Sequence, residues 1–248
     1  MGGIIKYLII SFVVLILSFN IYLNLNKETY FGDQQEKDFS KDNFKLYYFK
    51  GNGRGAIIRG LFSYAGVAFE NILVEKEWAE LKKNTTLFEF GQMPILVHNN
   101  KILSQSKPIY IYLARLFNIY GKTIDDQYQI DSLLSSYDDV LKTYLPVFFP
   151  KTEEEKNNPE KYKDIFAKEL KRFFGVYEKR YEKLGKGKYF LGNYFSLADI
   201  YLTINMNVFS KVLGGMTFIK ENAPNLGELI TRIKNNELKV YFEKYHFN

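Results

Sequence analysis

The sequence predicts a chain of two folded parts, an α/β unit followed by a bundle of helices. Short apolar runs with the length and composition of strands fall between residues 45 and 103. From residue 125 onward, apolar residues recur instead at the three- and four-residue spacing of helices. We place the α/β unit at residues 44–121 and the all-α part at residues 122–248.

The elements of the α/β unit follow in the order strand, helix, strand, and then strand, strand, helix. The predicted strands are residues 45–49, 69–74, 95–98 and 101–103. The predicted helices are residues 56–66 and 106–118, with a short helix or turn at 78–83. Gly66 and Gly121 end the two longer helices, and Asn99-Asn100 forms the turn of a hairpin. This order is that of a thioredoxin-like unit.

The C-terminal part is predicted to be entirely helical. A first helix carries the apolar positions Leu133, Leu134, Tyr137, Val140, Leu141 and Tyr144. Later helices are predicted around residues 165–177, 197–212, 226–234 and 237–245. Residues 151–163 are highly charged and are predicted as a loop. Ser196 and Asp199 form a capping box, which we interpret as a folding element.

The first 25 residues predict a membrane anchor or a signal segment. Residues 4–25 are mostly apolar, and as a helix they would be about 33 Å long, enough to cross a bilayer. We favour an uncleaved anchor, because no A-x-A-like cleavage site follows; a signal peptide and a helix of the folded part are the alternatives. Residues 26–43 are polar and are predicted as a tether. These observations predict a single-pass membrane protein of the endomembrane system.

Composition excludes several classes of function. The chain has 248 residues, of which 46% are hydrophobic and 17% aromatic, so it can bury a core and is not disordered. Its formal charge of +6 is spread along the chain, and we infer no nucleic-acid partner. There is no cysteine, which excludes disulfides, thiolate metal sites and a cysteine nucleophile. Any reactive sulfur must therefore arrive with a substrate.

Four segments resemble a known family. They are KLYYFKGNGRGAIIR from residue 45, FGQMPIL from residue 90, LSQSKPIYIYLAR from residue 103 and YFLGNYFSLADIY from residue 189. In this order they resemble the glutathione transferases, especially the sigma class. The resemblance implies the glutathione transferase fold, glutathione as co-substrate, a homodimer, and conjugation of glutathione to small hydrophobic electrophiles in detoxification.

The resemblance implies that Tyr48 donates a hydrogen bond to the glutathione sulfur. A free thiol has a pKa of about 8.5, so little of it is thiolate at neutral pH. A hydrogen bond to a charged acceptor is worth about 1.5–3 kcal/mol, which would lower that pKa by about 1–2 units. The alternative is that Tyr48, one of 20 tyrosines, simply packs. Tyr47 points to the opposite face of the strand and is predicted to take no part.

Arg54 lies in the glycine-rich loop before the first helix, where the family often places an arginine that steadies the sulfur site. The alternative is a solvated loop arginine. Gly51, Gly53 and Gly55 are expected to let the backbone approach a ligand. The loop lacks the ending of a phosphate-binding loop.

Two further segments are implied to contact glutathione. The Met93-Pro94 bond is expected to be cis, with the Met93 backbone pairing with the cysteinyl unit and Gln92 beside it; trans is the default for an isolated proline. Gln105 and Ser106 stand where a strand meets a helix N-terminus, which attracts anions. The family binds the γ-glutamyl carboxylate there, whereas the alternative for Ser106 is a helix cap alone.

The remaining site residues also come from the resemblance. Trp78 and Lys82 match the positions that hold the glycyl end of glutathione. Asp139 matches an aspartate of sigma-like dimers that reaches the glutathione of the partner subunit. A related prostaglandin synthase binds metal through another aspartate one turn earlier, but Ser135 stands there, so no metal is predicted.

The leading hypothesis is a glutathione transferase whose acceptor binds in an apolar cleft against the first bundle helix. Tyr144, Phe49 and Met206 are candidate lining residues. A glutathione-dependent isomerase or peroxidase would use the same site. A non-catalytic scaffold in a membrane complex is the alternative from another class. We favour the enzyme, because the residue types that contact glutathione are all present.

Overall fold

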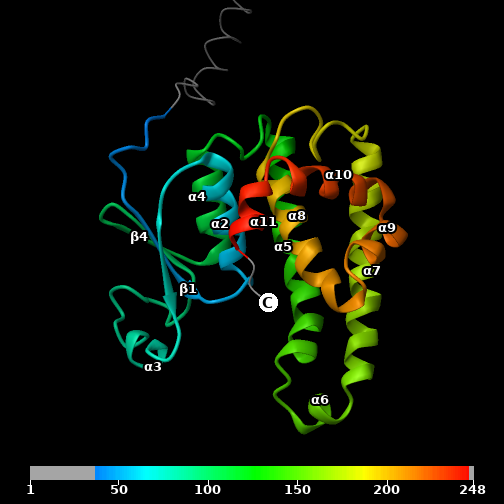
Figure 1. Cartoon of the computed structure of the whole chain (residues 1–248), viewed down its shortest axis with the longest axis horizontal. Helices are drawn as coiled ribbons and strands as arrows, with labels where there is room; N and C mark the ends of the chain where they lie inside the picture. The colour runs from blue at the N-terminus through cyan, green and yellow to red at the C-terminus, as the bar shows by residue number, and fades with distance from the viewer. Residues whose placement is uncertain (1–36, 246–248) are drawn as a thin grey trace, which may run out of the picture. The chain divides into compact units, whose positions relative to one another are not determined.

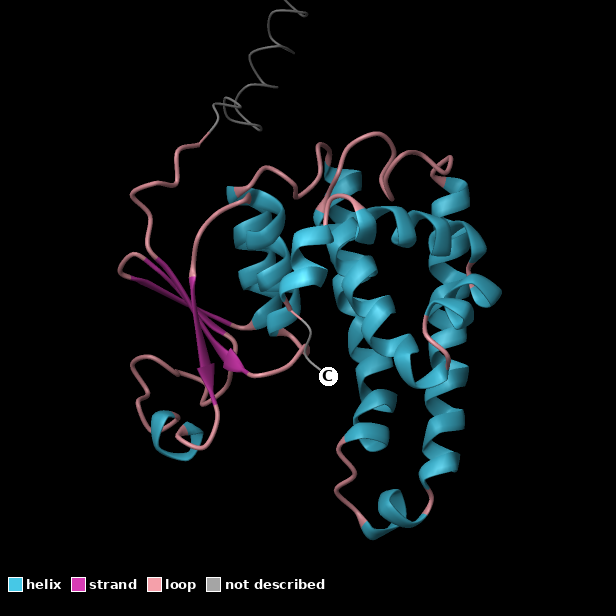
Figure 2. Ribbon diagram, viewed as in Figure 1, coloured by secondary structure: helices cyan, strands magenta, loops and turns pink. Residues whose placement is uncertain are grey.

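The computed structural model describes residues 37–245 (Figure 1). From Phe39 onward these residues form one compact unit. It combines a four-stranded sheet and its helices with a bundle of longer helices (Figure 2). The predicted fold class, a thioredoxin-like α/β part followed by a helical part, is confirmed. The boundaries at residues 25, 43 and 121 stay predictions.

The sheet has the strand order β2-β1-β3-β4. Its strands are β1 (Phe44–Phe49), β2 (Glu70–Val74), β3 (Ile95–His98) and β4 (Lys101–Ser104). β1 pairs with β2 in parallel and with β3 in antiparallel fashion, and β3 pairs with β4 across the predicted hairpin. The helices of this part are α2 (Gly55–Ala65), the short α3 (Trp78–Leu81) and α4 (Ser106–Leu116). Figure 1 shows α2 and α4 between the sheet and the helical part.

Alternation along β1 decides which of its side chains enter the core. Phe44 and Leu46 are buried in the main core, while Tyr47 packs edge-on against Phe88 on the other face, with ring centroids 6.0 Å apart. Because side chains alternate along a strand, Tyr48 shares the face of Phe44 and Leu46. Tyr48 therefore lies at the end of β1, on the face covered by α2.

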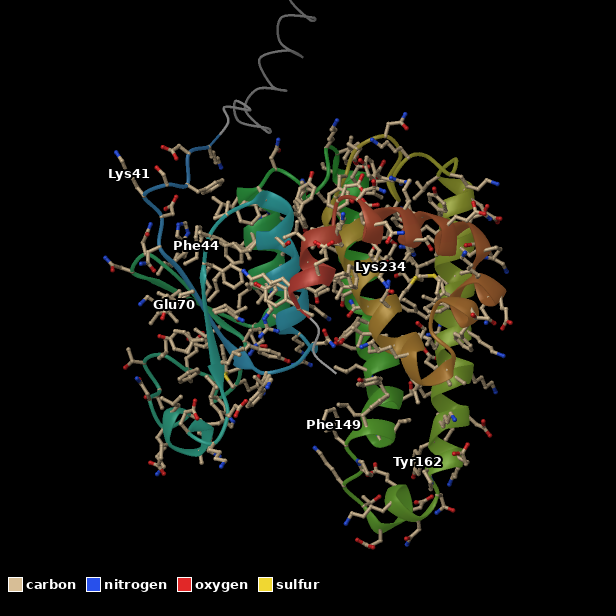
Figure 3. The ribbon with its side chains drawn as sticks, in the orientation of Figure 1. Lys41, Phe44, Glu70, Phe149, Tyr162 and Lys234 are labelled. Carbon is tan, nitrogen blue, oxygen red and sulfur yellow. The ribbon has the colours of Figure 1, made fainter. Side chains whose placement is uncertain are left out.

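The helical part is built on two long antiparallel helices. α5 (Ile124–Phe148) and α7 (Pro159–Lys183) run side by side and are joined at one end by α6 (Glu153–Asn157) (Figure 1). Phe149 lies beside the end of α5 (Figure 3). The remaining helices are α8 (Leu197–Ser210), a 3-10 turn (Lys211–Leu213), α9 (Met216–Asn222), α10 (Pro224–Asn235) and α11 (Lys239–Lys244). α8 packs against both α2 and α5, and so it joins the two parts.

The predicted capping box at the start of α8 is confirmed. The Asp199 carboxylate accepts hydrogen bonds from the backbone N–H and the hydroxyl of Ser196, both at 2.9 Å, and from the Phe190 N–H at 2.8 Å. Asp199 is 1% exposed, and burial raises the pKa of its carboxyl to about 6. This buried acid fixes the direction in which α8 enters the core.

One local prediction was wrong, and one helix was missed. Residues 151–163 are not a loop: they contain α6 and the first turn of α7. Thr152 and Glu155 form a capping box there, and Pro159 occupies the first turn of α7, where its missing N–H costs nothing. Helix α9 was not predicted, because it is short and follows Gly214 and Gly215, both at positive φ.

The predicted membrane location also requires correction. Between residues 37 and 245, every helix is too short or too polar to span a bilayer. The prediction of a membrane protein of the endomembrane system is therefore wrong for the described chain. The segment 4–25, on which it rested, lies outside the described residues.

Candidate active site

Tyr48 lies directly over the loop that connects β1 to α2. Its hydroxyl oxygen accepts a hydrogen bond from the Arg54 backbone N–H at 2.9 Å. A Cβ atom at Gly53 would come within 2.5 Å of that hydroxyl oxygen, and one at Gly55 within 2.4 Å of the ring. Both distances are shorter than real Cβ contacts, so a Cβ at either position would force the Tyr48 side chain to move. The structure thus gives these glycines a role that the sequence did not suggest, which is to make room for the Tyr48 ring.

A buried arginine is hydrogen-bonded to the same loop. Arg59, on α2, is fully buried and donates hydrogen bonds to the carbonyls of Gly51 (2.7 Å) and Phe49 (3.1 Å) and to Asn71 Oδ1 (3.2 Å). Its guanidinium carbon is 5.7 Å from the centroid of the Tyr48 ring. Burial lowers the pKa of Arg59. Sequence analysis missed this residue, because an arginine at a helical position is usually exposed.

A small hollow lies where β3, β4 and α4 meet. Its lining residues are Arg54, Phe90, Gln92, Met93, Pro94, Ser104, Gln105 and Ser106. The Met93-Pro94 bond is cis, which confirms that prediction. Gln105 has φ +66° and ψ 125°, a conformation that non-glycine residues rarely adopt, and it directly precedes the first turn of α4. The predicted residues from 92 to 94 and from 105 to 106 are therefore brought together.

Polar side chains rim this hollow. The Gln105 amide donates to the Gln92 amide oxygen at 3.3 Å. Ser104, the last residue of β4, donates its hydroxyl hydrogen to the carboxylate of Glu89. Glu89 was not singled out from the sequence, because it lies in an irregular loop outside the family motifs.

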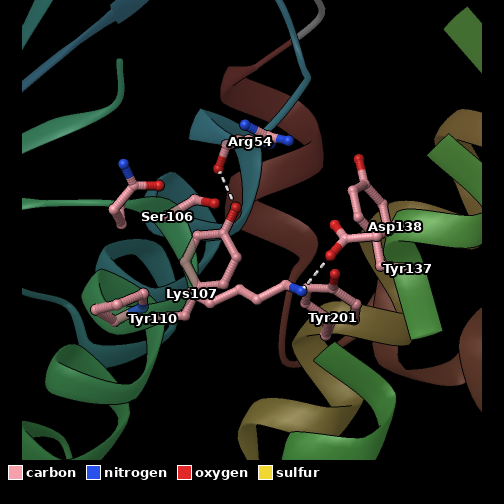
Figure 4. A pocket seen from close by; sticks show the side chains of 9 residues that line it. Arg54, Ser106, Lys107, Tyr110, Tyr137, Asp138 and Tyr201 are labelled. Atoms are coloured by element: carbon pink, nitrogen blue, oxygen red, sulfur yellow. Dashed lines mark hydrogen bonds and ion pairs between the residues drawn. The ribbon is translucent and has the colours of Figure 1, made fainter. Parts of the chain in front are cut away.

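A larger cavity of about 190 Å³ is also lined by Arg54 and Ser106 (Figure 4). Its lining residues are Arg54, Gln105, Ser106, Lys107, Pro108, Tyr110, Tyr137, Asp138 and Tyr201. They come from the loop before α2, from the start of α4, and from α5 and α8. Arg54, Gln105 and Ser106 line both spaces, so the small hollow and this cavity share a wall.

Two contacts order the cavity wall. Tyr110 donates its hydroxyl hydrogen to the carbonyl of Arg54 at 2.6 Å, and Lys107 forms an ion pair with Asp138 at 2.6 Å. Arg54 thus receives a hydrogen bond from Tyr110 and donates one to Tyr48, which connects the cavity to the end of β1. Burial raises the pKa values of Tyr110, Tyr137 and Tyr201, so all three are protonated near neutral pH.

Other predicted residues lie outside both spaces. Trp78 packs edge-on against Phe49 and Phe88, with ring centroids 5.8 and 5.2 Å away, and Lys82 is exposed at the end of α3. Asp139 is exposed and lies 3.5 Å from Lys142, whereas its neighbour Asp138 faces the cavity.

The predicted acceptor-lining residues Phe49, Tyr144 and Met206 line neither of these two spaces. Met206 is fully buried in the core, and Tyr144 stacks on Phe148. Tyr137 and Tyr201 line the cavity instead. Helical spacing identified Tyr137 as inward-facing, but it could not show that a space remained beside its hydroxyl. Among residues 37–245, no group of three or more acidic or histidine side chains could hold a metal ion.

Comparison with known proteins defines the family. Residues 42–115 match the N-terminal domain of glutathione S-transferases, and residues 138–245 match their C-terminal domain. The chain is 36% identical to glutathione S-transferase A4 of Mus musculus over 160 residues, which is 64% of this chain and 70% of that protein. The chain belongs to the glutathione S-transferase family. Glutathione is the co-substrate of this transferase, and its N-terminal part is the glutathione-binding domain.

Further relatives support this assignment. The chain is 32% identical over 160 residues to probable glutathione S-transferase 7 of Caenorhabditis elegans, covering 64% of this chain and 76% of the relative. A crystal structure of a C. elegans transferase superposes with a TM-score of 0.71 at 27% identity, covering 82% of this chain and 97% of that one. Monomeric Na-GST-3 of Necator americanus superposes with a TM-score of 0.69 at 27% identity, covering 81% and 96%.

Proposed function

We propose that this transferase conjugates glutathione to electrophiles through a thiolate that the Tyr48 hydroxyl stabilises, as sigma-class-like enzymes do. The supporting observation is the hydrogen bond from the Arg54 N–H to the Tyr48 oxygen. Because the oxygen accepts this bond, the phenolic hydrogen stays free to be donated. No acceptor among residues 37–245 is hydrogen-bonded to it. The same N–H also polarises the phenol and makes it a stronger donor.

Glutathione is proposed to lie along the small hollow. The backbone of Met93 pairs with its cysteinyl unit, with Gln92 alongside. The N–H groups at the start of α4, at Gln105 and Ser106, bind the γ-glutamyl carboxylate, because a helix N-terminus favours an anion. Trp78 and Lys82 hold the glycyl end.

Two charged residues complete the proposed arrangement. The Arg54 cation borders the hollow and favours the thiolate over the thiol. In a homodimer, Asp139 of the partner subunit reaches the γ-glutamyl end. The exposure of Asp139 in the single chain agrees with such a role.

The acceptor is proposed to be an electrophile with an apolar body that enters the cavity beside Tyr137 and Tyr201. That cavity shares a wall with the glutathione hollow at Arg54, whose backbone N–H donates a hydrogen bond to the Tyr48 hydroxyl oxygen. The thiolate sulfur attacks the electrophilic carbon, and the leaving group departs with the bonding electron pair. The thiol proton goes to solvent. Removal of such electrophiles is a detoxification reaction.

Replacing Tyr48 with Phe tests the proposal, because it removes the hydroxyl and keeps the ring. We expect conjugation of glutathione to benzyl chloride near neutral pH to fall about 10- to 100-fold, the equivalent of one charged hydrogen bond. Tyr47→Phe is the matched control, since Tyr47 lies on the opposite face of β1 and should leave the rate unchanged. Equal rates in wild type and Tyr48→Phe would remove Tyr48 from the mechanism, and binding of glutathione without any turnover would favour a scaffold.

A further inference from the structure

Two aromatic rings from distant parts of the chain approach one buried cation. The Arg59 guanidinium carbon lies 5.7 Å from the centroid of the Tyr48 ring and 5.8 Å from that of the Tyr245 ring. Tyr48 belongs to β1, whereas Tyr245 directly follows α11, which packs against α2 (Figure 1). Both distances lie within the range of about 6 Å over which a cation is attracted to an aromatic ring, and the attraction is strongest for a cation shielded from water. Arg59 is such a cation, because it is fully buried.

The hydrogen bonds of Arg59 tie the loop after β1 to the position of the guanidinium. Its two terminal nitrogens donate to the carbonyls of Gly51 and Phe49, at 2.7 and 3.1 Å, and the third nitrogen donates to a side chain on β2. A guanidinium is planar and its donors have fixed directions, so it cannot rotate without losing some of these bonds. Phe49 and Gly51 belong to the segment between Tyr48 and α2. A shift of the guanidinium would therefore move the segment that places the Tyr48 hydroxyl.

Tyr245 contacts this cation from the helical part of the chain. Its ring packs against Tyr241, with centroids 5.4 Å apart, and Tyr241 is itself buried. Tyr245 is half-buried, whereas Arg59 is fully buried. A half-buried ring beside a buried guanidinium helps to keep water away from it, and water would compete for its three donors. Burial lowers the pKa of Arg59, and the three neighbouring tyrosines oppose this shift.

We propose that Tyr245 is a positioning residue, whose ring packs on the Arg59 guanidinium and thereby keeps the loop after β1 in the arrangement that places the Tyr48 hydroxyl at the glutathione sulfur. This inference rests on the proposed function of Tyr48. Tyr245 lines neither the small hollow nor the cavity, so it acts through Arg59 and not on a substrate. The competing explanation is that Tyr245 only packs α11 against α2. Its loss would then lower stability and leave the thiolate unchanged.

Three single variants of the full chain separate these explanations. Tyr245→Leu removes the ring and keeps an apolar side chain of moderate size, so it should fold; Tyr245→Met, which also lacks a ring, replaces it if it does not. Tyr245→Phe keeps the ring. Phe242→Leu is the matched control, because Phe242 is on α11 and also has a cation near its ring, but that cation is Lys234, at 5.1 Å.

The first measurement is the thiol pKa of bound glutathione, read from the ultraviolet absorbance of the thiolate. We expect Tyr245→Leu to raise this pKa by about 0.5–1 unit, which lowers the ratio of thiolate to thiol about 3- to 10-fold. Tyr245→Phe and Phe242→Leu should match the wild type. Equal values in Tyr245→Leu and the wild type would overturn the inference. A rise of the same size in Tyr245→Phe or in Phe242→Leu would also overturn it, because the ring on Arg59 would then not be the cause.

Hydrogen exchange of the Arg54 amide separates this inference from the proposed function, because it needs no glutathione. That N–H is hydrogen-bonded to the Tyr48 oxygen at 2.9 Å, so its exchange rate reports how well the loop is kept in place. We expect exchange to be about 3- to 10-fold faster in Tyr245→Leu than in the wild type, and unchanged in Tyr245→Phe.

The two readings together have distinct outcomes. If Tyr48→Phe leaves the thiol pKa unchanged while the Arg54 amide shows the expected pattern, the proposed function fails and the positioning of the loop by Tyr245 stands. If Tyr48→Phe raises the thiol pKa and Tyr245→Leu alters neither reading, the proposed function stands and the inference fails.

Discussion

The two sides of the active site are built in different ways. On the side of the sheet, positions are fixed mainly by the backbone: glycines under Tyr48, a cis bond at Pro94, and a strained Gln105 before α4. On the side of the bundle, two phenols from regular helices line a cavity. Any chemistry with glutathione depends on this backbone geometry, whereas a side chain on a regular helix can be replaced without a change in the backbone. The difference predicts that the sheet side sets the reaction and the bundle side sets the acceptor.

The largest effect is expected from removing Arg59, whose hydrogen bonds stabilise the loop on the sheet side of the site. Arg59→Leu leaves the carbonyls of Phe49 and Gly51 without their buried donor. We expect the free energy of unfolding to fall by about 3–5 kcal/mol, because each hydrogen bond to a charged group contributes about 1.5–3 kcal/mol. Denaturant titration measures this loss. Arg172→Leu is the control, since Arg172 pairs with Glu169 on the surface and should cost less than about 1 kcal/mol. Equal losses would show that Arg59 does not support the loop.

The next effect is the pH dependence of stability that comes from Asp199, at the start of α8 on the bundle side. Burial raises the pKa of Asp199 from its ordinary value near 3.8 to about 6 in the folded chain, so the folded state keeps a proton that the unfolded state loses. Stability from this group is therefore present below about pH 4 and is lost as pH rises towards 6, by about 3 kcal/mol.

Asp199→Asn removes this titration. Stability curves between pH 4 and 6 should slope downward more steeply in wild type than in the variant, whatever the absolute stability of the variant. Parallel curves would show that Asp199 keeps its ordinary pKa, and that its three hydrogen bonds outweigh its burial.

A substitution at Gly55 tests whether the backbone places the phenol. In Gly55→Ala the new Cβ would lie 2.4 Å from Tyr48 Cδ1 and 2.7 Å from Cγ, near the root of the ring, so the whole side chain must move. We expect conjugation to fall about 100-fold, since a displacement of this size at a reacting group costs that much. Gly175→Ala in α7 meets no atom within 4 Å and should instead stabilise the fold by about 0.5–1 kcal/mol. Full activity in Gly55→Ala would contradict the account.

The smallest effect is expected at the rim of the cavity. Lys107 and Asp138 form an ion pair whose side chains are 30% and 48% exposed. Such pairs contribute less than about 1 kcal/mol to stability, so Lys107→Met should shift the denaturation midpoint only slightly. A large destabilisation would mean that the bundle side is held by this pair rather than by the packing of α8.

The same contrast explains what the sequence could and could not predict. The strands and the capping box at Asp199 were predictable, because turn residues and capping residues occur where the backbone takes a particular geometry. The cis bond at Pro94 was predictable from the resemblance to the family. Helix α9 was missed because it is short and enters through two glycines at positive φ. Tyr137 was recognised only as an inward-facing residue, and Arg59 was not recognised at all. Periodicity shows which face of a helix turns inward, but not whether a buried polar atom finds a partner there.

The thiol pKa of bound glutathione tests the central claim most directly. It can be measured from the ultraviolet absorbance of the thiolate as pH is varied, in wild type, Tyr48→Phe and Tyr47→Phe. The account predicts a value about 1–2 units below the free thiol in wild type and Tyr47→Phe, and a return towards the free value in Tyr48→Phe. A thiol pKa that is the same in all three proteins would contradict it.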